Sequence, residues 1–150
     1  MRLSASLRII NERTAINIRT TEAEIVRIKN DIEALNVRIK ECHDVITTAN
    51  FHLLTFKIVG ASSLAEILES KHRQAVIKRK IAMAVMEKEE LNQQKIEHQE
   101  ALHAAQEKRK SLLRKADKFT NRIRELNKQR VLKQLNQLDN ELEEQLQWKM

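Results

Sequence analysis

Apolar residues recur every three or four positions along the first third of the chain, and mostly charged or amide side chains separate them. An alternating count of three and four residues meets apolar or small side chains, apart from Thr21, over more than five heptads. This stripe comprises Ile18, Thr21, Ile25, Ile28, Ile32, Leu35, Ile39, Cys42, Ile46, Ala49, Leu53 and Phe56. Such a repeat predicts a helix, about residues 3–59, that supercoils against a partner helix. Leu3, Leu7 and Ile10 continue the stripe upstream, with a small phase slip expected near Thr14.

The repeat breaks at residues 57–63, where a helix stop signal is followed at once by a start signal. Gly60 is the only glycine of the chain, and it predicts the residue just past a helix C-terminus. Ser63 and Glu66 form the pattern of a capping box, in which each side chain accepts a hydrogen bond from the other residue's amide. A stop and a start this close predict a short turn at about 60–63 between antiparallel helices.

A second helix is predicted from about residue 64 to 148. Its apolar stripe runs from Ile77 to Leu126 and is interrupted by three cations, whose stems are expected to lie along the seam with their charges in water. These cations are Lys88, Lys95 and Arg109. After Leu126 the stripe shifts phase and extends beyond the reach of the first helix, so it implies an external partner or self-association. Its members are Val131, Leu135, Leu138, Leu142, Leu146 and Trp148.

Together these patterns predict an all-α fold: two long helices in an antiparallel coiled-coil hairpin, a single domain over residues 1–150, with a C-terminal helix overhang. Ala, Glu, Lys, Leu and Arg make up about half of the 150 residues, which agrees with this class. One glycine and no proline argue against turn-rich β folds and phosphate-binding loops. The same heptads also allow a parallel homodimer, because isoleucine at alternate seam positions suits two-stranded coiled coils.

No residue pattern predicts catalysis, a metal site or a cofactor, so we expect a non-enzymatic protein. His98 and His103 are five residues apart, roughly 140° around a helix, whereas a chelating pair needs a spacing of four. No local element would bring an orienting histidine and an acid around Cys42, which is expected to be a small seam residue. A single cysteine, no leader-like N-terminus and no apolar stretch that could span a membrane lead us to expect a cytoplasmic location.

The net charge of +7 is unevenly distributed. Eleven basic residues lie between Lys108 and Lys133, opposed only by Asp117 and Glu125, and the tail then becomes acidic. The basic residues spread around all faces of the predicted helix, and Phe119 is the only aromatic residue nearby for stacking on bases. We therefore expect a solvated helix or an acidic protein partner rather than a nucleic-acid partner.

Three stretches of the chain share their order of charges with a known family. They are the turn Gly60–Glu66, the stretch Lys71–Ile81, and the run Lys110–Arg130 with its Leu-Leu-Arg-Lys segment at 112–115. In this pattern the chain resembles the central-stalk family of type III secretion systems, which includes FliJ, YscO and InvI. The resemblance implies a stalk that sits in the central hole of a hexameric secretion ATPase, with the end that holds both termini inside the ring. It implies that the hairpin end faces the export-gate protein. Secretion chaperones are a further class of partner that we consider.

The resemblance and the residue pattern together give two candidate surfaces. The surface expected to bind the ATPase comprises Arg122, Arg124, Lys128, Arg130, Leu135, Leu138 and Leu142. The surface expected to bind the export gate comprises Phe51, Phe56, Val59, Lys71 and Arg73. The alternatives are a nucleic-acid-associated basic coiled coil and an export chaperone or escort protein.

Overall fold

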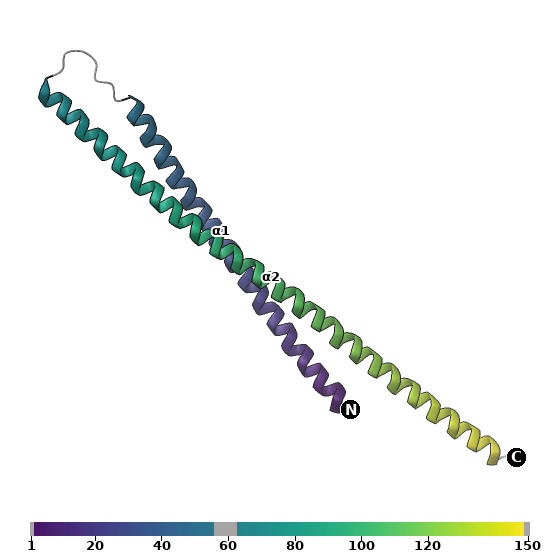
Figure 1. Ribbon diagram of the computed structural model, residues 1–150. Helices are drawn as coiled ribbons and strands as arrows, with labels where there is room; N and C mark the ends of the chain where they lie inside the picture. Colours follow the sequence, from purple (N-terminus) through teal and green to yellow (C-terminus); the bar gives the residue numbers. More distant parts are fainter. Residues whose placement is uncertain (1, 56–62, 149–150) are drawn as a thin grey trace. The chain divides into compact units, whose positions relative to one another are not determined.

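The computed structural model describes residues 2–55 and 63–148, and within these ranges the chain is helical without strands (Figure 1). Helix α1 spans Arg2–Thr55 and helix α2 spans Leu64–Trp148. The two helices pack against each other, which confirms the predicted all-α hairpin. The expected glycine turn at Gly60 and the expected helix end at 56–59 lie outside the described residues.

The chain divides into two compact units, each of which pairs a segment of α1 with a segment of α2. The turn unit comprises residues 25–104, and the terminal unit comprises residues 1–24 with 105–150. The single domain expected from the sequence stays a prediction.

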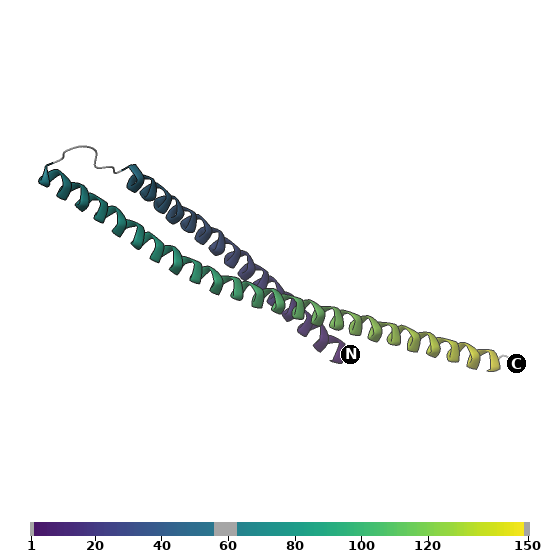
Figure 2. The ribbon, with the colours of Figure 1, turned by 45° about the horizontal axis from the view of Figure 1, so that its top comes forward.

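Ion pairs in the turn unit show that its two helical segments run antiparallel. Asp31 Oδ2 lies 4.0 Å from His98 Nε2, and Arg38 Nη2 lies 3.6 Å from Glu87 Oε1. From the first contact to the second, the residue number rises in α1 and falls in α2, as it does in antiparallel helices. Figures 1 and 2 show the two segments beside one another in this unit. Exposed pairs of this kind contribute little stability, so they report the register more than they enforce it.

The core of the turn unit is a single layer of seam residues. Leu35, Cys42 and Leu91 form a buried cluster against which Ile39 packs. Leu91 is only 2% exposed. The other buried apolar residues of the unit also lie on the two predicted stripes; they are Ile25, Ile28, Ala49 and Ala84. The apolar period thus identified the residues that hold the helices together.

In the terminal unit the seam contains two threonines, and here one sequence expectation is wrong. Thr14 is 6% exposed and Thr21 is 1% exposed. Leu7, Thr14 and Thr21 follow one another at intervals of seven, so no phase slip occurs near Thr14. Leu3 and Ile10, which were expected on the stripe, are instead 58% and 42% exposed.

The physical reason for this difference is that the Thr14 hydroxyl does not need water. Thr14 Oγ1 donates a hydrogen bond to the carbonyl oxygen of Ile10 at 2.9 Å. A buried polar group that is hydrogen-bonded in this way costs little. A count of apolar residues alone treats such a threonine as a break in the stripe.

The three cations that interrupt the α2 stripe are half-buried, as expected from their aliphatic stems. In the terminal unit the charge of Arg109 is paired as well as solvated, because its Nε lies 3.1 Å from Glu22 Oε1. In the turn unit Lys88 Nζ lies 3.5 Å from His43 Nδ1. An ammonium group can only donate, so this ring nitrogen accepts.

The start of α2 shows one of the two hydrogen bonds of the predicted capping box, and the return bond from the Ser63 amide to the Glu66 carboxylate is not formed among the described residues. The amide of Glu66 donates to Ser63 Oγ at 3.2 Å, and the amide of Ile67 donates to the Ser63 carbonyl oxygen at 3.1 Å. The Ser63 side chain thereby satisfies the Glu66 amide, which has no partner within the helix, and the Ser63 carbonyl accepts the first hydrogen bond of the helix itself.

We expect replacement of Leu91 by alanine to lower the free energy of unfolding by about 2–5 kcal/mol, because it removes the most deeply buried leucine of a thin seam. Val85→Ala is the matched control, since Val85 lies on α2 but is 46% exposed, and its effect should stay within about 0.5 kcal/mol. Urea unfolding followed by circular dichroism measures both. Equal losses in the two variants would contradict the assignment of the seam.

Candidate partner-binding surfaces

Helix α2 continues beyond its contact with α1. Ile123 and Leu126 are the last half-buried seam residues of α2, and residues 127–148 are all exposed. We call residues 127–148 the tail. Its existence confirms the predicted C-terminal overhang.

The apolar residues of the tail lie on a different face of α2 from the seam. Val131 follows Leu126 by five residues, which turns it by roughly 140° around the helix. The positions that would continue the seam are occupied by Arg130, Lys133 and Gln137. The tail is therefore not patterned to pair with α1. Four of the six predicted stripe residues keep a regular spacing of three and four, and we call them the tail stripe: Val131, Leu135, Leu138 and Leu142, each 50–56% exposed. Leu146 and Trp148, the other two, are 61% and 89% exposed and do not continue this spacing.

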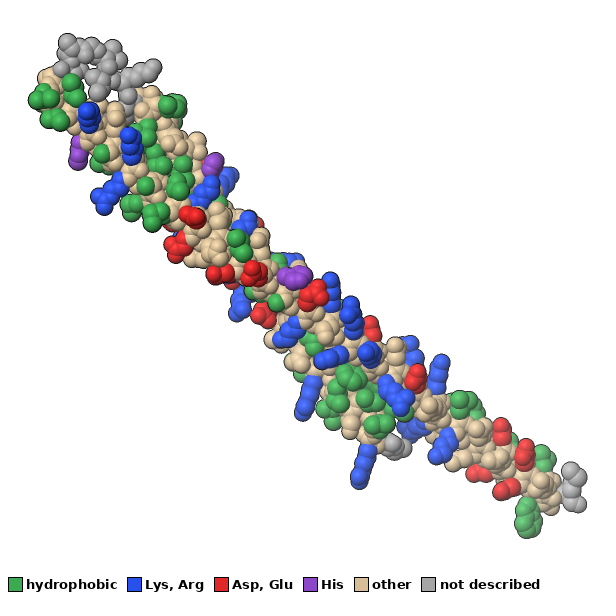
Figure 3. Space-filling model, in the orientation of Figure 1, with side chains coloured by type: hydrophobic (Ala, Val, Ile, Leu, Met, Phe, Trp, Pro, Cys, Tyr) green, Lys and Arg blue, Asp and Glu red, His purple; other side chains and the backbone are tan. Residues whose placement is uncertain are grey.

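Cations precede the tail stripe and lie along its first half. Arg124, Lys128 and Arg130 are exposed and form no ion pair among the described residues. Arg122 Nη1 lies 3.4 Å from Glu125 Oε2, but both side chains are at least half exposed, so this pair is weak. Figure 3 shows the Lys and Arg side chains giving way to Asp and Glu side chains toward the end of the tail. The charges are thus polarised along the helix axis.

The residues expected to face the export gate are only partly described. Phe51 is 65% exposed, and its ring meets the His52 ring edge-on at a centroid distance of 6.4 Å. Lys71 is exposed, and Arg73 Nη2 lies 2.7 Å from Glu69 Oε1 on the same face of α2. No hydrogen bond or ion pair links these predicted residues to one another within the described ranges.

Phe56 and Val59, the other two residues of this expected surface, lie outside the described residues. Lys71 and Arg73 are ordinary exposed cations, and nothing in their surroundings marks them as a binding site. Phe51 is different, because a large exposed aromatic ring is an uncommon surface group in a chain that is only 3% aromatic.

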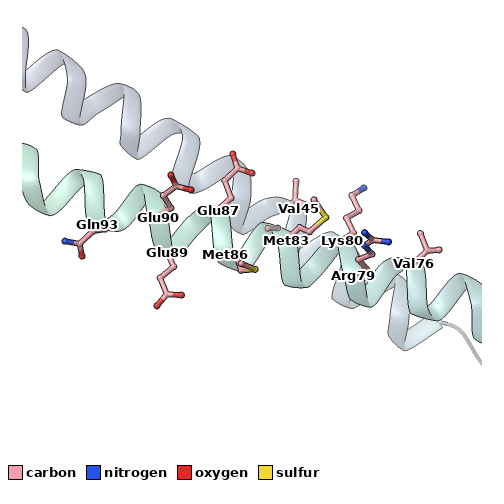
Figure 4. Close-up of a pocket in the computed structure, with 11 residues that line it drawn as sticks. Val45, Val76, Arg79, Lys80, Met83, Met86, Glu87, Glu89, Glu90 and Gln93 are labelled. Carbon is pink, nitrogen blue, oxygen red and sulfur yellow. The ribbon is translucent and has the colours of Figure 1, made fainter.

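The sequence did not single out a groove in the turn unit, where α2 residues 76–93 lie along Val45 of α1 (Figure 4). Met83 and Met86 line it and are 63% and 70% exposed. Exposed methionines are adaptable contact groups because their unbranched side chains can repack around different partners. The groove runs from basic to acidic along α2, through Val76, Arg79, Lys80, Met83, Met86, Glu87, Glu89 and Glu90. We call it the methionine groove.

Cys42 is buried in the seam as a free thiol, as expected. Burial raises the pKa of the Cys42 thiol, and the nearby Glu87 carboxylate raises it further, against a smaller lowering by Arg38. The thiolate is the reactive form, so these surroundings lower the reactivity of the thiol. The position serves packing.

Within residues 2–55 and 63–148, no three histidine, cysteine or carboxylate side chains are grouped in a way that could hold a metal ion. In the same ranges, neither helix contains an apolar stretch that could cross a membrane.

The fold and these surfaces define a coiled-coil protein whose distinctive features are exposed apolar and charged faces. A family model described as Salmonella surface presentation of antigen gene type M protein matches residues 7–146. The chain belongs to this family, which is a structural or accessory family of type III secretion. It is therefore a type III secretion-associated protein. Comparison with curated proteins and with solved structures finds no match.

We expect the thiol of Cys42 to react with Ellman's reagent at least about tenfold more slowly in the folded chain than in the urea-unfolded chain, because burial suppresses both access and ionisation. A Val45→Cys variant in a Cys42→Ala background is the control, since Val45 is partly exposed on the same helix, and it should react rapidly. Fast reaction of native Cys42 would contradict a purely structural role.

Proposed function

We propose that this chain is the non-enzymatic central stalk of a type III secretion system, which works in the cytoplasm between a hexameric secretion ATPase and the export gate. The observation that carries the proposal is the tail: a helical segment that α1 leaves uncovered, with unpaired cations followed by an apolar stripe. Membership in a type III secretion family supports the secretion context.

The distribution of the cations favours a partner that surrounds the helix. Lys128 lies roughly 40° around α2 from Arg124, whereas Arg130 lies on another side, roughly 160° from Lys128. A helix bound on a flat or grooved surface can use one such side only. A helix inside a ring can use them all, because acidic groups repeat around the hole and steer a basic helix inward without holding it at one angle.

The tail stripe then supplies the apolar contact that the charges alone do not give. Leu135, Leu138 and Leu142 have no partner in the terminal unit among the described residues. Burial of half-exposed leucines against the ATPase would anchor the stalk after electrostatic steering has brought it into place.

In the turn unit, Phe51 is the residue through which we propose binding to the export gate. An exposed aromatic ring can fill a pocket on a partner at low entropic cost, which makes it the strongest candidate anchor in that part of α1. Phe56, Val59, Lys71 and Arg73 remain predicted members of the same surface.

An escort function, in which the chain binds export chaperones or secreted subunits, is the second candidate. The observation that favours it is the methionine groove, whose exposed Met83 and Met86 suit an amphipathic helix of a partner. Binding in that groove is compatible with a stalk, because the groove belongs to the turn unit and the proposed ATPase contact belongs to the terminal unit.

Reversal of the unpaired cations tests the stalk proposal. We expect the triple variant Arg124→Glu, Lys128→Glu and Arg130→Glu to lose stimulation of the secretion ATPase, because it replaces attraction into the ring by repulsion. Helicity should be unchanged, since these side chains make no ion pair in the described chain. ATP hydrolysis by the purified ATPase, measured with and without the chain, provides the readout.

The matched control reverses three exposed cations of α1, Arg27, Lys29 and Lys40, which produces the same net charge outside the tail. This control should stimulate the ATPase as the wild type does. Equal loss in both variants would show that only total charge matters. Tight binding of the wild type to nucleic acid at physiological salt, together with no effect on the ATPase, would contradict the stalk proposal.

The second test concerns the export gate. We expect Phe51→Ser to weaken binding to the cytoplasmic part of the export-gate protein by about tenfold, as for loss of an aromatic anchor. Ile16→Ser is a suitable control, because Ile16 is 60% exposed on the same helix but lies in the terminal unit. Calorimetric titration measures both affinities, and an unchanged affinity for Phe51→Ser would remove this residue from the proposed contact.

A further inference from the structure

The tail stripe has the same spacing in both directions along the helix. Its four residues, Val131, Leu135, Leu138 and Leu142, are separated by four, three and four positions. If two tails lie antiparallel, Val131 of each copy faces Leu142 of the other, and Leu135 faces Leu138. Antiparallel coiled coils form their apolar layers from such alternating pairs, so these four residues can pack against their own copies.

The charges of the tail select the same orientation. Lys128, Arg130 and Lys133 lie in its first part, and four carboxylates lie in its last part. The carboxylates are Asp139, Glu141, Glu143 and Glu144. In an antiparallel pair the basic part of each copy lies beside the acidic part of the other. Lys128 lies within roughly 50° of the centre of the stripe, whereas Arg130 and Lys133 lie roughly 110° and 170° from it, so these two attract the other copy at longer range without a direct contact across the interface. In a parallel pair like charges would face each other at both ends, which is unfavourable.

We propose that the tail stripe binds the tail stripe of a second copy of this chain, antiparallel, with the two-fold axis between residues 136 and 137. The interface is self-complementary and closed, so association stops at the dimer and does not continue into a filament. The inference does not depend on the stalk proposal. It concerns the same stripe, however, so a second copy and the ATPase exclude each other there.

The size of the interface sets its strength. Four apolar side chains per copy make a contact well below the roughly 800 Å² per partner of a stable complex. The dimer therefore forms reversibly and depends on protein concentration. The helical conformation of the tail is already present in the described chain, so pairing does not have to order it.

Sedimentation equilibrium of the purified chain tests the proposal. We expect the apparent mass to rise from the monomer value of 17.6 kDa toward twice that value as the concentration increases through the micromolar range. The double variant Leu135→Glu and Leu138→Glu should remain monomeric where at least half of the wild type is dimeric. The control Leu68→Glu and Val85→Glu adds the same charge at exposed apolar positions of the turn unit and should dimerise like the wild type.

Spin labels test the orientation. Asn140 and Gln147 are one heptad apart, so they lie on nearly the same side of the tail. In the proposed dimer the two labels at position 140 are roughly 10 Å apart along the axis, and those at position 147 are roughly 30 Å apart. A parallel dimer gives equal distances at both positions. The labels are introduced as cysteines in a Cys42→Ala background and measured by pulsed electron resonance.

The outcomes separate clearly. A mass that rises in the wild type but not in the tail variant, with unequal label distances, supports the proposal. A wild type that stays monomeric at several hundred micromolar overturns it, and so do equal label distances or a tail variant that still dimerises. Circular dichroism of each variant confirms that the helices are intact. Failure of ATPase stimulation leaves this result unaffected, because the chain is measured alone.

Discussion

The structure depends on one constraint: two of every seven residues in each helix must bury themselves against the other helix. In α1 the most buried of these are spaced by exact sevens, from Thr14 through Cys42 to Ala49. A seam of this kind forms a single layer of small and branched side chains, with little room for a deep cavity. The remaining five positions of every heptad are left to the surface. Function in such a protein has to come from exposed faces.

The unequal lengths of the helices decide where the most distinctive face lies. Helix α2 has 85 residues and α1 has 54. If the apolar seam of α2 continued past Leu126, its residues would lie where α1 no longer reaches and would have no partner helix. Instead, Arg130 and Lys133 occupy the seam positions after Leu126, and the leucines move to another side of the helix. The tail is thus patterned for contacts outside the hairpin.

Most of the fold could be predicted from local sequence because each helix carries its own apolar stripe. Its period needs no knowledge of the partner, and the Ser63 cap needs only the first turn of α2. Thr14 escaped prediction since its hydroxyl is satisfied by the carbonyl of Ile10, which an apolar count cannot register. The methionine groove escaped for a different reason. It depends on Val45 lying beside Met83, and that is a property of the register between helices.

For the predicted binding residues, too, the sequence predicts what depends on one helix and misses what depends on a partner. Their exposure could be inferred from their places off the seam, as for Phe51 and Arg124, but the partner that covers each cannot be read from one helix.

If both proposals hold, one stripe of the tail serves two occupants. An apolar face left uncovered in water promotes non-specific association. The proposed antiparallel pairing would cover this face while the protein is free, and the cations that favour this pairing would also attract an acidic ring. Because the self-pairing is short, a ring that contributes several subunits at once would displace it. The weakness that makes the proposed dimer reversible would therefore keep the stripe available for the proposed ATPase contact.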